Sequence, residues 1–233
     1  MKKTQKNLKI TTKDFLVTGE SFDLLLDSKR DLLITSPQPK AEDLAKYYKS
    51  DAYISHTDSK ETFVASLYQN VKKYSLALKL RLILTLNGSP GSLLDIGAGT
   101  GDFLKLAKDN GWDVKGVEPN DGASNLARKK NLEIYENIDM LSGKTFDVVT
   151  LWHVLEHLPD LEIITKKIED LIKPGGTLIV AVPNFKSYDA KHYKNYWAAY
   201  DTPRHLWHFS KTAMSTIFQL RHCLLGCGQI YQH

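Results

Sequence analysis

Three glycines stand at alternate positions, Gly97, Gly99 and Gly101, directly after an apolar run that contains Asp95. Glycine lets the backbone turn sharply and lets a ligand approach without a Cβ atom in the way. A helix that begins directly after such a turn presents free backbone N–H groups to the ligand. The spacing is therefore typical of a ligand-binding loop, although a tight strand-to-helix turn without a ligand would have the same pattern.

An acidic side chain, Glu118, follows the glycines after roughly twenty residues, the spacing found in nucleotide-binding sheets. At the end of a second strand, its carboxylate could accept hydrogen bonds from both hydroxyls of a ribose. A surface glutamate at a strand end is the alternative. The two features together predict a nucleoside-containing cofactor. A dinucleotide motif requires a third glycine at position 102, where the chain has Asp102, and this disfavours NAD.

A second polar group, His153, Glu156 and His157, has the H-x-x-E-H spacing of some zinc proteases. That chemistry requires a helix bearing the motif and a third ligand downstream. An apolar, strand-like run ends at Trp152, and Pro159 interrupts the segment soon afterwards. We therefore expect no metal here. A capping or core role is the alternative for His157.

A polar and aromatic segment extends from residue 196 to residue 210. Its ionisable groups are Asp201, Arg204, His205 and His208. We expect His205 to act as a general base toward a substrate, because histidine exchanges protons near neutral pH. The alternative is a packed aromatic lid, shaped by a structural ion pair between Asp201 and Arg204.

The elements that must position these residues follow from the apolar pattern. After Gly91, short apolar runs alternate with helical segments, which predicts a parallel sheet built from right-handed strand–helix–strand units. We expect strands at 92–96, 113–117, 132–135, 146–152 and 177–182. Ligands bind such sheets at the carboxyl ends of the strands, where the motifs above fall. Before this region, apolar spacings of three and four between Phe63 and Leu86 predict a long amphipathic helix.

Four segments in this order, 93–102, 116–120, 146–160 and 171–180, make the chain resemble the class I S-adenosylmethionine-dependent methyltransferases. The resemblance extends over residues 80–210, and the chain looks like the branch that includes the ubiquinone-biosynthesis O-methyltransferases. It implies an α/β fold, with a Rossmann-like core and a mainly parallel sheet of strand order 3-2-1-4-5.

The same resemblance divides the chain into three parts. Residues 1–90 are expected to form an N-terminal extension and helical cap, and residues 91–220 the S-adenosylmethionine-binding core. Residues 221–233 do not look like the terminal hairpin of the family, so we expect a missing or incomplete hairpin and an unpaired edge at the fifth strand. Some relatives carry a zinc-binding cysteine pair near the amino terminus. This chain has Asp27–Arg30 there, so no metal is expected.

The resemblance also assigns site residues. The glycines would cradle the methionine part of the cofactor and Glu118 its ribose, with the adenine near residues 137–138 and the transferred methyl near residues 152–153. The expected cofactor-binding set is Asp95, Gly97, Ala98, Gly99, Gly101, Glu118, Pro119, Asn137, Ile138, Trp152 and His153. The catalytic candidates are His205 and His153, and the acceptor-binding candidates are Tyr196, Tyr200, Arg204 and His208.

The expected reaction is transfer of a methyl group to an oxygen of a small-molecule acceptor. A catalytically inactive S-adenosylmethionine-binding module, an NAD-dependent oxidoreductase and a zinc hydrolase are the alternatives.

The composition narrows the possible partners. The 233 residues suffice for one sizeable core, and 31 Lys and Arg against 27 Asp and Glu leave a net charge of only +4. We therefore expect no nucleic-acid partner. No run approaches 18 apolar residues, so no membrane span is expected. The amino terminus lacks the apolar region of a secretory signal, and Cys223 and Cys227 cannot form a disulfide scaffold, so we expect a cytoplasmic location.

Overall fold

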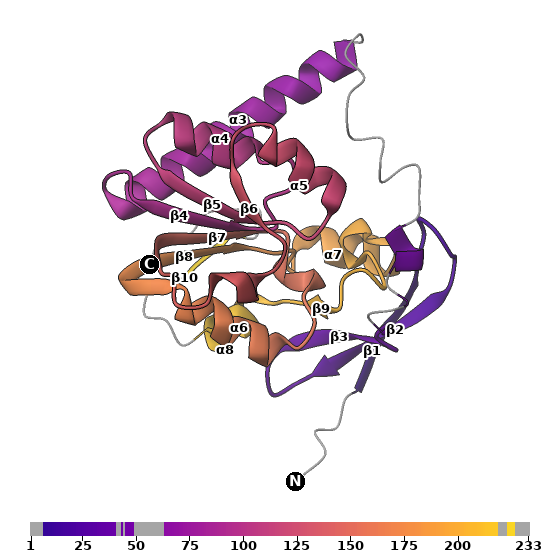
Figure 1. The fold of residues 1–233 in the computed structure, drawn as a ribbon. Coiled ribbons are helices and arrows are strands. Elements are labelled where there is room, and N and C mark those ends of the chain that lie inside the picture. The colour runs from indigo at the N-terminus through magenta and orange to yellow at the C-terminus, as the bar shows by residue number, and fades with distance from the viewer. Residues whose placement is uncertain (1–6, 41–42, 44, 49–62, 219–222, 227–233) are drawn as a thin grey trace.

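A parallel sheet forms the centre of the molecule (Figure 1). The computed structural model describes residues 7–40, 43, 45–48, 63–218 and 223–226. The sheet has the order β10-β8-β7-β4-β5-β6, and every neighbouring pair is parallel. Its strands are β4 (Ser92–Ile96), β5 (Asp113–Val117), β6 (Glu133–Tyr135), β7 (Phe146–Trp152), β8 (Ile172–Ala181) and β10 (Cys223–Gly226). The predicted α/β class and five-strand order are confirmed.

Helices cover both faces of this sheet, as Figure 1 shows. One face carries α3 (Phe63–Asn87), α4 (Asp102–Asp109) and α5 (Asp121–Arg128), and the other carries α6 (Leu161–Asp170) and α8 (Lys211–Ile217). Leu93 and Val148 pack into the hydrophobic core under α3 and α4, whereas their chain neighbours Leu94 and Val149 pack into the core under α6 and α8. Adjacent strand residues point to opposite faces, so the continuous apolar runs of these strands fill both cores.

A second, antiparallel sheet lies beside the carboxyl ends of the first. Its order is β1-β2-β3-β9, and its strands are β1 (Asn7–Lys13), β2 (Ser21–Asp27), β3 (Leu32–Ser36) and β9 (Trp207–His208). The sequence predicts a helical cap in this part of the chain. In residues 7–36 the structure has three strands instead of helices, followed by the 3₁₀ helix η1 (Ala45–Tyr48) and by α3. Asp14 stabilises the β1–β2 turn by accepting hydrogen bonds from the backbone N–H groups of Leu16, Val17 and Thr18.

Two short helices lie in the connections of the central sheet, η2 (Ile138–Leu141) and η3 (Leu155–His157). Three more connect β8 of that sheet to β9 of the other, namely α7 (Tyr188–Tyr193), η4 (Lys194–Tyr196) and η5 (Ala198–Tyr200). Because β9 pairs with β3, with Leu33 opposite His208, the segment after α7 is fixed to the amino-terminal sheet. This segment contains the polar and aromatic residues 196–210 singled out in the sequence.

The edge beyond β8 differs from the prediction. We expected the fifth strand of the core to lack a partner, but β10 pairs with it from Cys223 opposite Leu178 to Gly226 opposite Ala181. The expectation of an unpaired edge is therefore wrong. His222, Cys227 and His233 lie outside the described residues.

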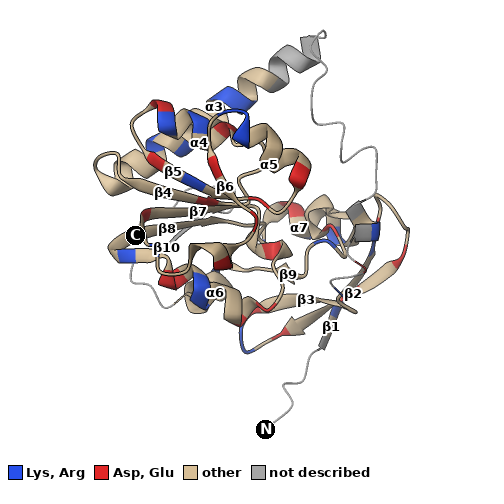
Figure 2. Cartoon of the chain, in the orientation of Figure 1, with Lys and Arg blue, Asp and Glu red and all other residues tan. Residues whose placement is uncertain are grey.

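Charged residues of both signs are distributed around the central sheet (Figure 2). None of the helices in the described part of the chain combines the length and the apolar character needed to cross a membrane.

Candidate functional site

The turn between β4 and α4 fits closely against the segment that follows β7. Gly97 has φ of 75°, and a Cβ atom at this position would lie 2.2 Å from Cγ2 of Val154. At Gly101 a Cβ atom would lie 2.5 Å from Cδ1 of Leu132 and 2.8 Å from Cβ of Ala127. The first glycine therefore lets the Val154 side chain pack directly against the end of β4. The second lets the start of α4 pack on the α5 region.

Glu118 follows β5 and ties the glycine turn to its own strand. Its Oε2 accepts a hydrogen bond from the Gly99 amide at 2.8 Å, and its Oε1 accepts one from the Asn120 amide at 2.9 Å. A carboxylate has about four lone-pair sites, so two such bonds leave capacity for ligand hydroxyls. In front of Gly99 there is open space, because a Cβ atom there would meet nothing within 4 Å.

A cavity of about 520 Å³ opens at the carboxyl ends of the central strands. It brings together seven of the residues expected to bind the cofactor, which are Gly97, Glu118, Pro119, Asn137, Ile138, Trp152 and His153. The other four, Asp95, Ala98, Gly99 and Gly101, do not belong to its lining. These four lie in β4 or in the turn that supports the wall.

The sequence analysis missed half of the lining. The missed residues are Ile96, Val117, Glu136, Val154, His157, Leu158 and Ile164. Three of them end or directly follow a core strand, namely Ile96, Val117 and Glu136, and Val154 is the second residue after β7. Their positions at the ends of expected strands were the signal in the sequence that could have identified them as cavity residues. Nothing in the sequence distinguishes Leu158 or Ile164 from other apolar residues that fill the core.

Asp95 lies behind this wall and is buried. Its Oδ1 accepts a hydrogen bond from the Thr150 hydroxyl at 2.6 Å, which links β4 to β7. Burial raises the pKa of the Asp95 carboxyl to about 7, against the opposing effects of the Thr150 hydrogen bond and the Lys79 charge. Asp95 therefore joins β4 to β7 behind the wall.

Trp152 and His153 end β7 on the cavity wall. The Trp152 ring meets the Phe103 ring edge to face, with centroids 5.8 Å apart. The ammonium group of Lys79, a residue of α3, lies 4.5 Å from the centroid of the Trp152 ring. Its indole N–H is buried without a hydrogen-bond partner. His153 has φ of 59°, its side chain is 65% exposed, and its Nδ1 lies 3.6 Å from Oε1 of Glu156. The strained turn therefore presents the imidazole to solvent at the cavity.

Arg204 occupies the join between the two sheets and is 1% exposed. Its guanidinium donates to Oδ1 of Asp201 at 2.6 and 2.9 Å, to Oδ1 of Asp14 at 3.0 Å and to the Tyr47 carbonyl at 2.8 Å. The structural ion pair considered from the sequence is therefore present, and it extends to the amino-terminal sheet. The Arg204 guanidinium is therefore used in hydrogen bonds that hold the fold together.

The two remaining histidines of this segment are buried. His205 is 9% exposed, its Nδ1 contacts the Ala199 carbonyl at 2.9 Å, and it does not line the 520 Å³ cavity. Burial, together with the nearby His157, lowers the pKa of His205 to about 4. His208 lies in β9, where its Nε2 is 2.9 Å from the Thr35 hydroxyl. Burial lowers the pKa of His208 well below its usual value.

A smaller cavity of about 250 Å³ is lined by the end of β1 and by the segment 196–204. Three of the expected acceptor-binding residues, Tyr196, Tyr200 and Arg204, contribute to its lining, and His208 does not. The structure therefore places three of the four expected acceptor residues around a cavity separate from the one lined by the cofactor candidates.

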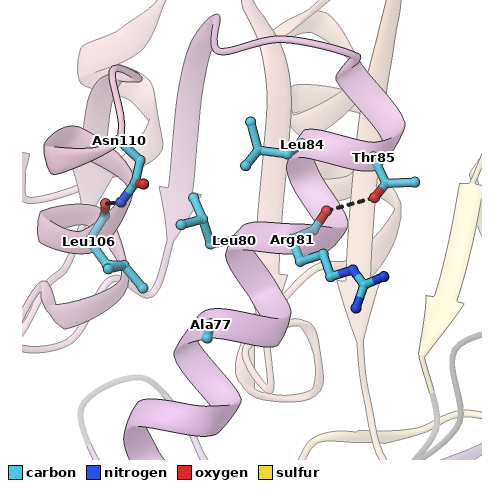
Figure 3. A pocket seen from close by; sticks show the side chains of 7 residues that line it. All are labelled: Ala77, Leu80, Arg81, Leu84, Thr85, Leu106 and Asn110. Carbon is cyan, nitrogen blue, oxygen red and sulfur yellow. Dashed lines mark hydrogen bonds between the residues drawn. The ribbon is translucent and has the colours of Figure 1, made fainter.

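A third hollow, of about 450 Å³, lies between α3 and α4 (Figure 3). Its polar side chains are used locally, because Thr85 donates to the Arg81 carbonyl at 2.9 Å and Asn110 donates to the Leu106 carbonyl at 2.8 Å. Arg81 supplies its one charged side chain. A hollow with no acid or base to move a proton is a poor candidate for the chemistry.

Comparison with known proteins places this geometry in context. A family model described as a methyltransferase domain matches residues 68–222, which is more than half of the chain. Among solved structures, an S-adenosylmethionine-dependent methyltransferase from Archaeoglobus fulgidus is similar, with a TM-score of 0.52 and 22% identity. The match covers 67% of this chain and 72% of that one, and it concerns the fold.

Two curated relatives are similar in sequence. A ubiquinone biosynthesis O-methyltransferase from Coxiella burnetii is 34% identical over 116 residues, which cover 45% of this chain and 49% of that protein. A protein of the same name from Paraburkholderia phymatum is 32% identical over 108 residues, covering 41% and 47%. The chain therefore spans about half the length of the curated relatives it matches.

Proposed function

Because the chain belongs to the methyltransferase-domain family, we propose that it transfers a methyl group from S-adenosylmethionine to an oxygen of a small-molecule acceptor. The observation that carries this proposal is the 520 Å³ cavity, which has Glu118 after β5 on one side and His153 after β7 on the other. It lies at the carboxyl ends of the strands, where α/β sheets bind their ligands.

The residues present fit the cofactor. Gly99 faces open space at the turn, Glu118 retains acceptor capacity for ribose hydroxyls, and the Trp152 indole N–H is an unused donor. Apolar side chains of Val117, Ile138 and Leu158 line the same cavity and suit a flat adenine ring. This combination of an apolar lining and a few convergent polar groups is typical of small-molecule sites.

When bound, S-adenosylmethionine supplies a methyl group on a positively charged sulfur, which an acceptor oxygen can attack. The protein's contribution is then mainly alignment, because holding the reacting atoms in line can supply several kcal/mol of the barrier. The turn at Gly97 and the carboxylate of Glu118 would hold the cofactor. The wall formed by the end of β7 would exclude water from the reacting atoms.

A hydroxyl acceptor also requires a base, and we place that role at His153. It is exposed and lines the cavity, whereas His205 is buried and does not. Burial that lowers the pKa of His205 to about 4 also makes its imidazole a weak base. Oxygen as the accepting atom is further supported by the two similar relatives, which are both named O-methyltransferases.

Asp102 argues against the NAD-dependent alternative. It occupies the position of the third glycine of a dinucleotide motif, and its carboxylate forms ion pairs with Lys72 and Lys130. The beginning of α4 is therefore closed by a salt-bridged side chain at the point where a dinucleotide fold requires close backbone approach.

The proposal is tested by incubating the protein with S-adenosylmethionine carrying an isotope-labelled methyl group and with fractionated cell extract. We expect release of S-adenosylhomocysteine and one extract component that gains the label, both absent with Glu118→Ala. Fragmentation of the labelled product by mass spectrometry then locates the methyl group on oxygen or on nitrogen. A methyl group on nitrogen contradicts the assignment to oxygen, and absence of S-adenosylhomocysteine with every fraction contradicts the enzyme assignment.

A further inference from the structure

A group of metal-ligating side chains lies at the wall of the 520 Å³ cavity, with two members buried and the third, His157, half-buried in the cavity lining. Glu156 and His157 come from η3, and His205 comes from the segment before β9. Each offers one ligand atom, and these three atoms lie within 4.8 Å of one another. The His157 and His205 rings meet edge to face, with centroids 4.5 Å apart. Residues about fifty positions apart are thus brought together by the fold, which the sequence motif alone did not predict.

The carboxylate of this cluster lacks hydrogen-bond donors. Glu156 is 1% exposed, and neither Oε1 nor Oε2 has a hydrogen-bond partner. Nδ1 of His153 lies 3.6 Å from Oε1. Burying a carboxylate without donors is costly, and buried charges in proteins are normally paired or bound to a metal. A cation bound between Glu156 and the two imidazoles would offset this cost.

Hydrogen bonds to the backbone orient both imidazole rings. Nδ1 of His205 lies 2.9 Å from the Ala199 carbonyl oxygen, and Nδ1 of His157 lies 3.0 Å from the Arg204 carbonyl oxygen. A carbonyl oxygen only accepts, so Nδ1 of each ring carries the hydrogen and Nε2 of the neutral ring carries the lone pair. Metal-binding histidines almost always donate their other ring N–H to such a carbonyl or carboxylate.

The backbone around the cluster is fixed as well. The Leu206 amide donates to the Glu156 carbonyl at 2.8 Å, which ties η3 to the segment that carries His205. Next to it, Arg204 is held by Asp14 and Asp201. A site whose ligands come from two segments needs such a connection, because the ligands must keep their spacing in the absence of the ion.

We propose that Glu156, His157 and His205 bind a divalent transition-metal ion such as Zn²⁺. Two imidazoles with one carboxylate are a nitrogen-rich donor set that suits zinc, iron, cobalt or nickel, whereas Mg²⁺ and Ca²⁺ prefer sites made of oxygen. Three atoms at zinc-ligand distances in a tetrahedron lie roughly 3.3 Å apart, so binding would draw the three atoms inward. Three protein ligands leave one position for water or another small ligand.

The site departs from the zinc-protease arrangement considered in the sequence. That arrangement would use His153 and His157 on one helix, but His153 points to the cavity and η3 is a single 3₁₀ turn. The third ligand is His205 instead. The proposal concerns metal binding and does not depend on methyl transfer.

Metal binding is measured on the full chain without a polyhistidine tag. Cys223 and Cys227 are both replaced by Ser so that their thiols do not compete for the ion. After treatment with a chelator, the protein is titrated with Co²⁺ and with Zn²⁺ alone, by absorption spectroscopy and elemental analysis. We expect about one ion per chain, the visible absorption of low-symmetry Co²⁺ with nitrogen ligands, and a higher melting temperature with the ion.

Substitutions locate the ion. Glu156→Gln keeps the size of the side chain and should lower Zn²⁺ affinity by at least about 100-fold, and His205→Gln should do the same. The matched control is His192→Gln, an exposed histidine on α7 that should leave binding unchanged. If the variants fold poorly, the Co²⁺ absorption spectrum and the change in melting temperature of the parent protein still show whether it binds the ion. Absence of stoichiometric Co²⁺ and Zn²⁺ binding overturns the proposal, and so does binding that survives both cluster substitutions.

Discussion

The Glu118 carboxylate accepts a hydrogen bond from the Gly99 amide at 2.8 Å, so the side chain after β5 holds the loop after β4. A second bond from the Asn120 amide fixes the other carboxylate oxygen. Both oxygens are oriented before any ligand arrives, which lowers the entropy lost on binding. The acid expected from the sequence to contact a ribose thus also serves as a support of the glycine turn.

The close approach of Gly97 and Val154 predicts coupled substitutions. Gly97→Ala places a Cβ atom 2.2 Å from the Val154 side chain and should reduce both stability and S-adenosylmethionine affinity. Val154→Ala removes the two methyl groups that collide and leaves only Cβ, 3.3 Å away, so the double variant should be more stable than the sum of the single changes predicts by about 0.5–3 kcal/mol. Urea unfolding of the four proteins gives this coupling energy. Additive losses in the free energy of unfolding would show that positions 97 and 154 do not constrain each other.

Asp95 predicts a pH-dependent stability. Its folded pKa of about 7 exceeds the unfolded value of 3.8, so between these values the native state holds a proton that the unfolded chain has lost. The contribution of Asp95 is therefore present below pH 4 and is lost as the pH rises through 7, by about 4 kcal/mol at most. Asp95→Asn keeps a partner for Thr150 and cannot titrate.

Unfolding in urea near pH 4 and near pH 8 measures this effect. The free energy of unfolding of the parent protein, minus that of Asp95→Asn, should fall as the pH rises. Both proteins contain His205 and His208, so the effects of these two titrations cancel in the difference. An unchanged difference between the two pH values would show that Asp95 titrates normally in the folded protein.

The position of His153 predicts a separation of binding from turnover. His153→Ala should leave S-adenosylmethionine affinity almost unchanged, because Glu118 and the glycine turn remain. Turnover should fall by roughly 10²–10⁴-fold, the usual contribution of a general base. Calorimetry gives the affinity and S-adenosylhomocysteine release gives kcat. A loss of affinity as large as the loss of turnover would place His153 in the cofactor pocket only.

Arg204 predicts a large structural effect. Arg204→Ala leaves Asp14 and Asp201 without their buried cation and should destabilise the fold by about 3–5 kcal/mol. Lys186→Ala is the control, because it breaks the partly exposed pair with Asp31, and such pairs are worth about 0–1 kcal/mol. Thermal unfolding of both variants compares them. Equal losses would mean that burial does not strengthen the Arg204 pairs.

The central sheet was predictable because its signal is local. Runs such as Ser92–Ile96 and Phe146–Trp152 are apolar throughout, as strands covered on both faces must be, and turn residues separate them from helices. The glycine turn and Glu118 were predictable for the same reason, since their spacing follows from one strand–helix–strand unit. Ranges assigned from the sequence therefore match β4, β5 and β7 in the structure.

Features that depend on distant pairing were not predictable. The amino-terminal sheet needs β9, whose His208 lies opposite Leu33, and no local pattern links the two. His205 looked available for catalysis because its neighbours in the chain are polar and aromatic. Its burial results from packing against His157 and from the Ala199 contact, both of which exist only in the folded protein.

Calorimetric titration with S-adenosylmethionine tests the central claim most directly. The parent protein should bind about one molecule per chain, and Glu118→Ala should bind 10–100-fold more weakly, since hydrogen bonds to a charged group are worth about 1.5–3 kcal/mol. Glu162→Ala, which removes an exposed carboxylate on α6, should bind normally. Circular dichroism must show that all three are folded. Absence of S-adenosylmethionine binding by the folded parent protein, or equal affinity in Glu118→Ala, would contradict the account.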